Sequence, residues 1–79
     1  MTIEQLREVH RAQPFKPFVL ELADGNQVSV SHPEILWINP KNPRTVIVAM
    51  PDGGFKIIDL LLVATIHVKN GRQSSRGRN

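Results

Sequence analysis

The sequence contains no cysteine, and its aromatic side chains are three phenylalanines and one tryptophan. Without cysteine, the chain can form neither a disulfide framework nor a metal site made of thiolates. A chain of 79 residues is near the lower limit at which a single core is self-sufficient, so we expect one domain at most. Its stability must come from packing, with or without oligomerisation.

Long hydrophobic runs are also missing, because no apolar stretch approaches the ~20 residues of a membrane-spanning helix. The first ten residues, MTIEQLREVH, are amphipathic and contain two glutamates, which is unlike a secretory signal. The lack of cysteine fits a reducing compartment. We therefore expect a soluble cytoplasmic protein that does not bind the membrane.

The net charge of +3 is divided unevenly along the chain. Residues 1–68 carry six basic and seven acidic side chains, whereas residues 69–79 carry four basic side chains and no acidic one. The last eleven residues also lack any hydrophobic side chain, so they cannot bury enough surface to order themselves. We expect a single globular domain over residues 1–68 and a disordered basic tail over residues 69–79.

The densest apolar segment, Gly54–Val68, has ten hydrophobic residues in fifteen and is expected to form the centre of the fold. Its second half allows two interpretations. Asp59 could cap a helix that ends before Gly71. The β-branched residues in 63–68 favour instead a tight corner over 59–62 followed by a strand, and this is the interpretation we adopt.

The rest of the chain reads as one helix followed by short strands. Thr2 and Gln5 have the spacing of a capping box, and the helix should end before Pro14. Alternating apolar residues and the turn sequences DGN and PDGG then predict strands. The expected strands are 18–23, 28–31, 35–38, 44–50, 55–58 and 63–68.

These elements predict a mainly β fold of the α+β type. A short N-terminal helix would pack on a small, bent antiparallel sheet of five or six strands that forms a partly open barrel. A helix on an open meander, without closure, is the alternative. We expect Leu20, Val30 and Ile57 to share one core.

The order of the elements resembles that of the Sm-like barrels, the fold of bacterial RNA chaperones. In that family an N-terminal helix precedes five bent strands, and a one-turn corner separates the last two. The resemblance implies an RNA site with a lysine–histidine pair near this corner. Here the corresponding residues are Ile57, Ile58 and Asp59, so that site is not implied for this chain.

A second resemblance rests on four motifs: PFKPF at residues 14–18, LADG at 22–25, HPE at 32–34 and IIDLLLV at 57–63. Together they are similar to a pattern in a group of short, uncharacterised bacterial proteins. This resemblance spans most of the chain and implies no activity.

Catalytic patterns are missing from the sequence. His10, His32 and His67 have no partner at metal-ligand spacing, and the triplet His32-Pro33-Glu34 is more simply a turn than a proton-sharing pair. There is neither a nucleophile elbow nor a phosphate-binding glycine loop. We expect no enzyme activity and no metal or other cofactor.

Two kinds of binding remain. Some side chains of Leu60, Leu61, Leu62 and Val63 should reach the surface, which predicts an assembly or partner surface over residues 57–63. Trp37 could extend it as an anchor or stacking platform, although its apolar neighbours favour a core position. The alternative is weak nucleic-acid (RNA) binding, for which the candidate phosphate contacts are Lys69, Arg72, Arg76 and Arg78.

Overall fold

The computed structural model describes residues 2–69. Its first element is helix α1 (Ile3–His10), which begins with the predicted capping box. The Thr2 N–H donates to Gln5 Oε1 over 3.1 Å, and the Gln5 N–H donates to Thr2 Oγ1 over 3.3 Å. Eight residues are too few for a stable isolated helix, so α1 depends on packing through the fully buried Leu6.

Six antiparallel strands follow, and they form two three-stranded sheets. The first sheet has the order β2-β1-β6, and the second has the order β3-β4-β5. Strand bounds are β1 (Phe18–Leu22), β2 (Gln27–Val30), β3 (Leu36–Ile38), β4 (Thr45–Ala49), β5 (Phe55–Asp59) and β6 (Val63–Val68). The predicted mainly β architecture with a short helix is confirmed, but within residues 2–69 the strands do not close into a barrel.

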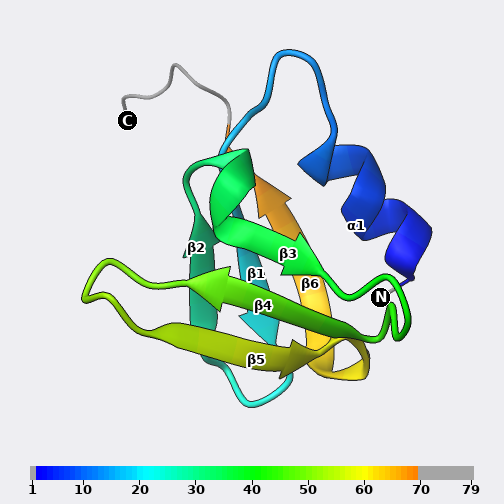
Figure 1. Ribbon diagram of the computed structural model, residues 1–79, viewed down its shortest axis with the longest axis vertical. Coiled ribbons are helices and arrows are strands. Elements are labelled where there is room, and N and C mark those ends of the chain that lie inside the picture. The colour runs from blue at the N-terminus through cyan, green and yellow to red at the C-terminus, as the bar shows by residue number, and fades with distance from the viewer. Residues whose placement is uncertain (1, 70–79) are drawn as a thin grey trace.

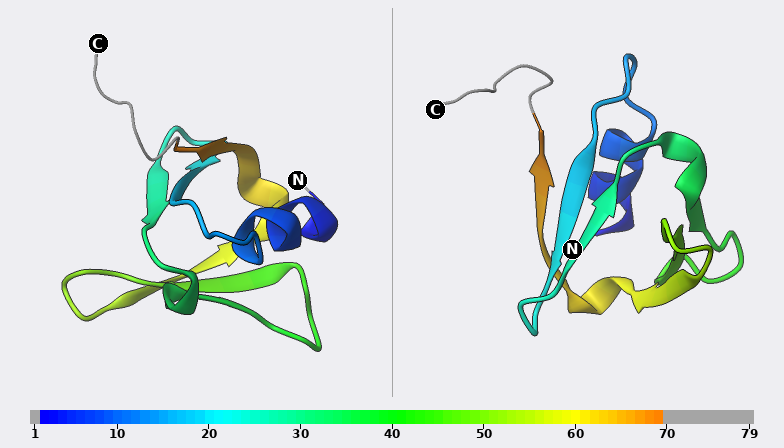
Figure 2. Two further views of the ribbon diagram at one scale, coloured as in Figure 1. Left: turned by 90° about the horizontal axis from the view of Figure 1, so that it is seen from above. Right: turned by 90° about the vertical axis from the view of Figure 1, so that its left-hand side faces the viewer.

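The two sheets cross in Figure 1, where β1, β2 and β6 run vertically behind the more horizontal β3, β4 and β5. Figure 2 shows the sheets as two layers, with α1 at the side where they separate. The core lies between the layers and takes side chains from both sheets and from the helix. It consists of Leu6, Phe18, Leu20, Val28, Val30, Leu36, Val46, Val48, Ile58, Leu60 and Val63.

Two short 3₁₀ turns connect the sheets, η1 (Pro33–Ile35) between β2 and β3 and η2 (Leu60–Leu62) between β5 and β6. The predicted corner and final strand are therefore confirmed, and the alternative helix from Asp59 is wrong. Ile35, expected as the first residue of a strand, belongs instead to η1. The Pro33 ring favours this turn, because its fixed φ suits the first residue of a helical turn.

The turns between paired strands confirm the sequence prediction at two positions. Gly25 and Gly53 have φ values of +91° and +93°, a region that L side chains rarely adopt. Each glycine follows an aspartate, and in each turn the Asp Oδ1 accepts a backbone N–H two residues ahead, from Asn26 at 3.0 Å and from Gly54 at 2.8 Å.

Two predictions about the core are wrong. Ile57 is 65% exposed, and its neighbour Ile58 takes the core position instead. Trp37, for which a core position was favoured, is 52% exposed and lies between the buried Leu36 and the half-buried Ile38. Leu36 and Ile58 are buried in the core, and adjacent residues of a strand project from opposite sides, so Trp37 and Ile57 project from the outer side of the second sheet.

Candidate interaction surfaces

The outer side of the second sheet carries a row of large apolar side chains. Trp37 of β3 lies opposite Ile47 of β4, and Ile47 in turn lies opposite Ile57 of β5. Phe55, 64% exposed, lies opposite Ala49 at one end of the row. Because directly opposed residues in a sheet project from the same side, these side chains form one surface. We call Trp37, Ile47, Phe55 and Ile57 the outer apolar face.

The outer side of the first sheet is different in character. Its cross-strand rows are Ser29–Val19–His67 and Gln27–Glu21–Thr65. Five of these six residues are polar, as expected for a sheet with one face toward water. The two sheets share one core, yet only the second exposes a continuous apolar outer surface.

The outer apolar face is large for so small a protein. Trp37, Phe55 and Ile57 each leave more than half of their surface exposed. Since one large side chain offers roughly 150–250 Å², the whole face exposes on the order of 400 Å². Apolar patches of this size on monomers often mark interaction sites.

The corner between β5 and β6 is a second exposed apolar site. Leu61 and Leu62 are 65% and 53% exposed, whereas Leu60 is buried in the core. Leu60 was predicted to belong to a partner surface, and its burial removes it from any such surface of this fold. Its place in the core follows from the 3₁₀ turn, because three successive residues point in different directions.

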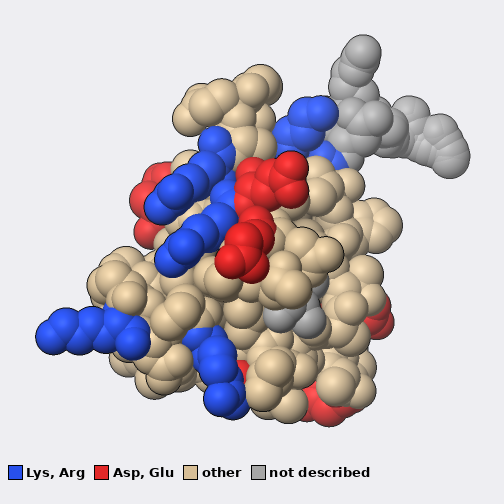
Figure 3. Space-filling view, turned by 90° about the vertical axis from the view of Figure 1, so that its right-hand side faces the viewer, with Lys and Arg blue, Asp and Glu red and all other residues tan. Residues whose placement is uncertain are grey.

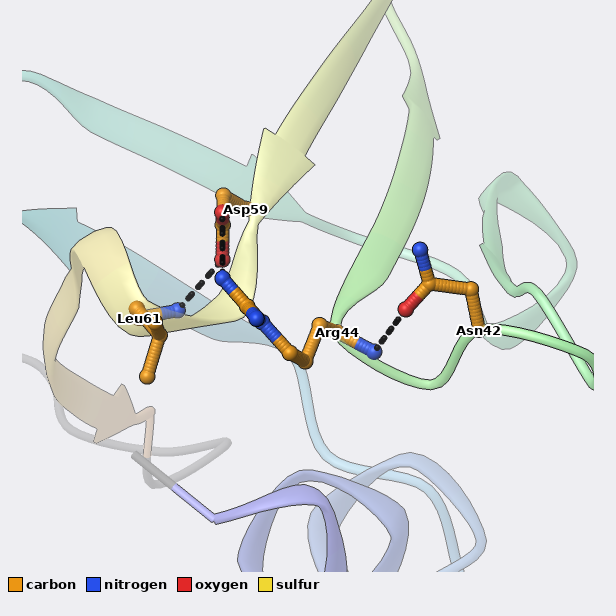
Figure 4. Close-up of polar contacts among 4 residues, drawn as sticks. All are labelled: Asn42, Arg44, Asp59 and Leu61. Atoms are coloured by element: carbon orange, nitrogen blue, oxygen red, sulfur yellow. Dashed lines mark hydrogen bonds and ion pairs between the residues drawn. The ribbon is translucent and has the colours of Figure 1, made fainter.

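Asp59 holds this corner through its side chain, as Figure 4 shows. Its Oδ1 accepts the Leu61 N–H over 2.9 Å, and its Oδ2 lies 3.3 Å from Nη2 of Arg44. The Arg44 N–H donates in turn to Asn42 Oδ1 over 3.3 Å. The sequence predicted the corner but not its contact with Arg44. Arg44 precedes Thr45, and Thr45 comes to lie opposite Asp59 only through the β4–β5 register.

The histidines do not converge on a site. His10 Nε2 donates to the Pro33 carbonyl oxygen over 2.7 Å, which ties the end of α1 to η1. Among residues 2–69, no group of three or more His, Asp or Glu side chains is arranged to hold a metal ion. No helix in the same part of the chain is long and apolar enough to cross a membrane.

The candidate phosphate contacts fall almost entirely outside the described residues. Lys69 is the exception, and its N–H donates to the Pro17 carbonyl oxygen over 2.8 Å, which extends the β1–β6 pairing. Arg72, Arg76 and Arg78 lie beyond residue 69. On the face in Figure 3, basic and acidic side chains lie next to one another, so the charges drawn there do not form a patch of one sign.

Comparisons with family models, with curated proteins and with solved structures find no match for this chain. The resemblances to Sm-like barrels and to the short bacterial proteins therefore stay predictions, and the functional argument rests on the surfaces themselves.

Proposed function

We propose that this protein is a non-enzymatic assembly module that self-associates through the outer apolar face. The observation that carries the proposal is the cross-strand row Trp37–Ile47–Ile57, exposed on a sheet whose other side is already buried. A row of this kind loses contact with water when it packs against a similar surface. We further propose a cytoplasmic location, which the lack of cysteine supports.

A second copy of the chain is the partner that this face suits best. Symmetric dimers place the same patch on both subunits, so the patch must complement itself. A patch of apolar side chains can complement a copy of itself, because it needs no oppositely charged partner. The charged pair at the edge, Arg44 and Asp59, has one charge of each sign, so it adds no net charge to the face.

The size of the face suggests a weak dimer. A standard interface buries about 800 Å² per partner, about twice the area that the face exposes. The remainder would come from polar residues around it. Because association also costs translational and rotational entropy, we expect a dissociation constant of about micromolar order.

Sedimentation velocity over a range of concentrations tests this proposal. We expect the mass to rise from monomer to dimer, and the emission of Trp37, the only tryptophan, to shift to shorter wavelength as the indole is buried. Ile57→Glu should keep the protein monomeric. His67→Glu is the matched control on the outer side of the first sheet and should leave the dimer intact. A monomer at every concentration, or equal effects of both variants, would contradict the proposal.

A further inference from the structure

A groove of about 470 Å³ lies beside β2 and borders the outer apolar face at Ala49, the residue opposite Phe55. Gln27, Ser29 and Ser31 line one side, and His32, Ile35, Ala49, Met50 and Pro51 complete the lining. The first set comes from β2, the edge strand of the first sheet, and the residue that follows it. The second set comes from η1 and the residue before it, from the end of β4 and from the start of the β4–β5 turn. This volume is within the range of known ligand sites.

The hydrogen bonds of the β1–β2 hairpin show which way the backbone of β2 points. The Leu22 N–H donates to the Asn26 carbonyl oxygen over 2.8 Å, in register with the rest of the ladder. In an antiparallel pair, hydrogen-bonded and non-hydrogen-bonded positions alternate. The next hydrogen-bonded pairs are therefore Leu20–Val28 and Phe18–Val30.

It follows that the residues between these positions point their backbone groups away from β1. These are Gln27 and Ser29, and Ser31 continues the alternation. Within residues 2–69, β2 has a strand neighbour on its β1 side only. Gln27, Ser29 and Ser31, which line one side of the groove, are thus the residues whose N–H and C=O groups point away from β1 and toward its open space. Such an edge accepts a further strand.

The opposite side of the groove is suited to the side chains of an added strand. Ile35 and Met50 are half-buried and pack against the core, so they extend its edge toward the groove. An added strand would direct every second side chain toward them, on the same side as Val28 and Val30. Apolar side chains at these alternate positions would continue the core.

Charge narrows the choice of ligand. Several acidic residues adjoin the lining: Glu21 lies directly opposite Gln27, and Glu34 and Asp52 are the sequence neighbours of Ile35 and Pro51. All three are exposed. Residues 70–79 of this chain have the complementary positive charge but no hydrophobic side chain, so they do not suit the apolar side of the groove.

We propose that this groove binds an extended segment of a partner protein by antiparallel strand addition to β2. The segment has apolar side chains at alternate positions, lysine or arginine at its ends, and no proline between them, because proline cannot donate to the ladder. The proposal rests on the free edge of β2 and not on the row Trp37–Ile47–Ile57, so either proposal can fail without the other.

The test uses an acetylated and amidated octapeptide with three threonine–valine repeats between two terminal lysines. Titration into ¹⁵N-labelled full-length protein should shift the amide signals of Gln27, Ser29 and Ser31. In this antiparallel arrangement, valines that contact Ile35 and Met50 leave the threonine amides to pair with β2. N-methylation of the threonines should then weaken binding at least tenfold, and N-methylation of the valines should not. A peptide with glutamates at its ends should bind several-fold more weakly.

Variants of the protein give the matching control. Ser29→Pro removes one edge donor and should weaken binding at least tenfold, whereas Ser29→Thr keeps the donor and should bind as before. If Ser29→Pro fails to fold, the affinities of the two methylated peptides for the unsubstituted protein still test the proposal. Ile57→Glu should leave peptide binding unchanged.

Three results would overturn the proposal. The first is equal affinity for both methylated peptides. The second is peptide binding that appears only after removal of residues 70–79, which would assign the groove to the tail. The third is a shift of the same three amides with protein concentration alone, which would assign it to a second copy.

Discussion

At the scale of single residues, Ile57 and Ile58 show how strongly the pleat of a strand separates two identical side chains. They are adjacent in β5, yet the first is 65% exposed and the second 4%. Ile57 lies opposite Ile47 on the outer side, and Ile58 lies opposite the fully buried Val46. The same substitution at the two positions should therefore have very different effects on stability.

We expect Ile58→Ala to lower the free energy of unfolding by ~2–5 kcal/mol, because it leaves a cavity in the core. Ile57→Ala should cost less than about 1 kcal/mol, since the side chain is largely in water already. Urea denaturation of dilute protein, where the monomer predominates, measures both. Equal losses would show that the assignment of the two faces of β5 is wrong.

Gly53 is a second residue whose role can be isolated. An added Cβ would meet no atom within 4 Å, so a substitution changes only the backbone preference at φ +93°. We expect Gly53→Ala to cost ~1–2 kcal/mol, and Gly53→Asn to cost less because asparagine tolerates this conformation. Thermal unfolding of the two variants checks the order. If Gly53→Ala left the stability unchanged, the positive φ at this turn would be contradicted.

At the scale of elements, the corner between β5 and β6 depends on one side chain. Asp59 accepts the Leu61 N–H at the start of η2 and also pairs with Arg44. The two contacts should contribute unequally to the free energy of unfolding. An exposed ion pair contributes little, whereas a capping hydrogen bond satisfies a backbone donor.

Asp59→Ala should therefore lower the free energy of unfolding by ~0.5–2 kcal/mol. Arg44→Ala should change it by at most about 1 kcal/mol, and this small effect should shrink further in added salt. Chemical denaturation at two salt concentrations separates the contributions. A larger loss for Arg44→Ala than for Asp59→Ala would show that the ion pair, not the cap, holds the corner.

The elements that the sequence predicted well are those set by local chemistry. The capping box at Thr2, the turns at Gly25 and Gly53 and the corner at Asp59 each depend on residues within a few positions of one another. The sides of the strands were harder to predict. Ile57 and Ile58 are equally apolar, and Trp37 has apolar neighbours on both sides, so the pattern alone does not show which residue is buried.

For the same reason, the outer apolar face and the β2 groove could not be found from the sequence. The row Trp37–Ile47–Ile57 is made by strand register, which brings together residues ten positions apart. The groove combines β2 with the start of a distant turn. The sequence did predict a partner surface at Trp37 and residues 57–63, and two of these residues, Trp37 and Ile57, belong to the outer apolar face.

At the scale of the whole molecule, charge and hydrophobic surface are separated. Residues 1–68 have a net charge of −1, whereas residues 69–79 carry four basic side chains and no acidic one. Sheet β3-β4-β5 has an apolar outer side, whereas sheet β2-β1-β6 has a mostly polar one. This division is why we propose contact between proteins through the body, and why the alternative hypothesis of nucleic-acid binding concerns the tail.

The tail can therefore be tested by itself. Truncation after Lys69 keeps the backbone bond from Lys69 to Pro17 and removes Arg72, Arg76 and Arg78. We expect this shortened chain to match the full chain in stability and in self-association and to bind no duplex DNA at low salt. Any affinity of the full chain should have a slope of log affinity against log salt no steeper than about −3.6, because the tail offers at most four phosphate contacts. Fluorescence anisotropy of labelled DNA over a salt series measures it. Tight binding that survives truncation would contradict this division of charge and would point to a surface of the body, with Trp37 the first residue to substitute.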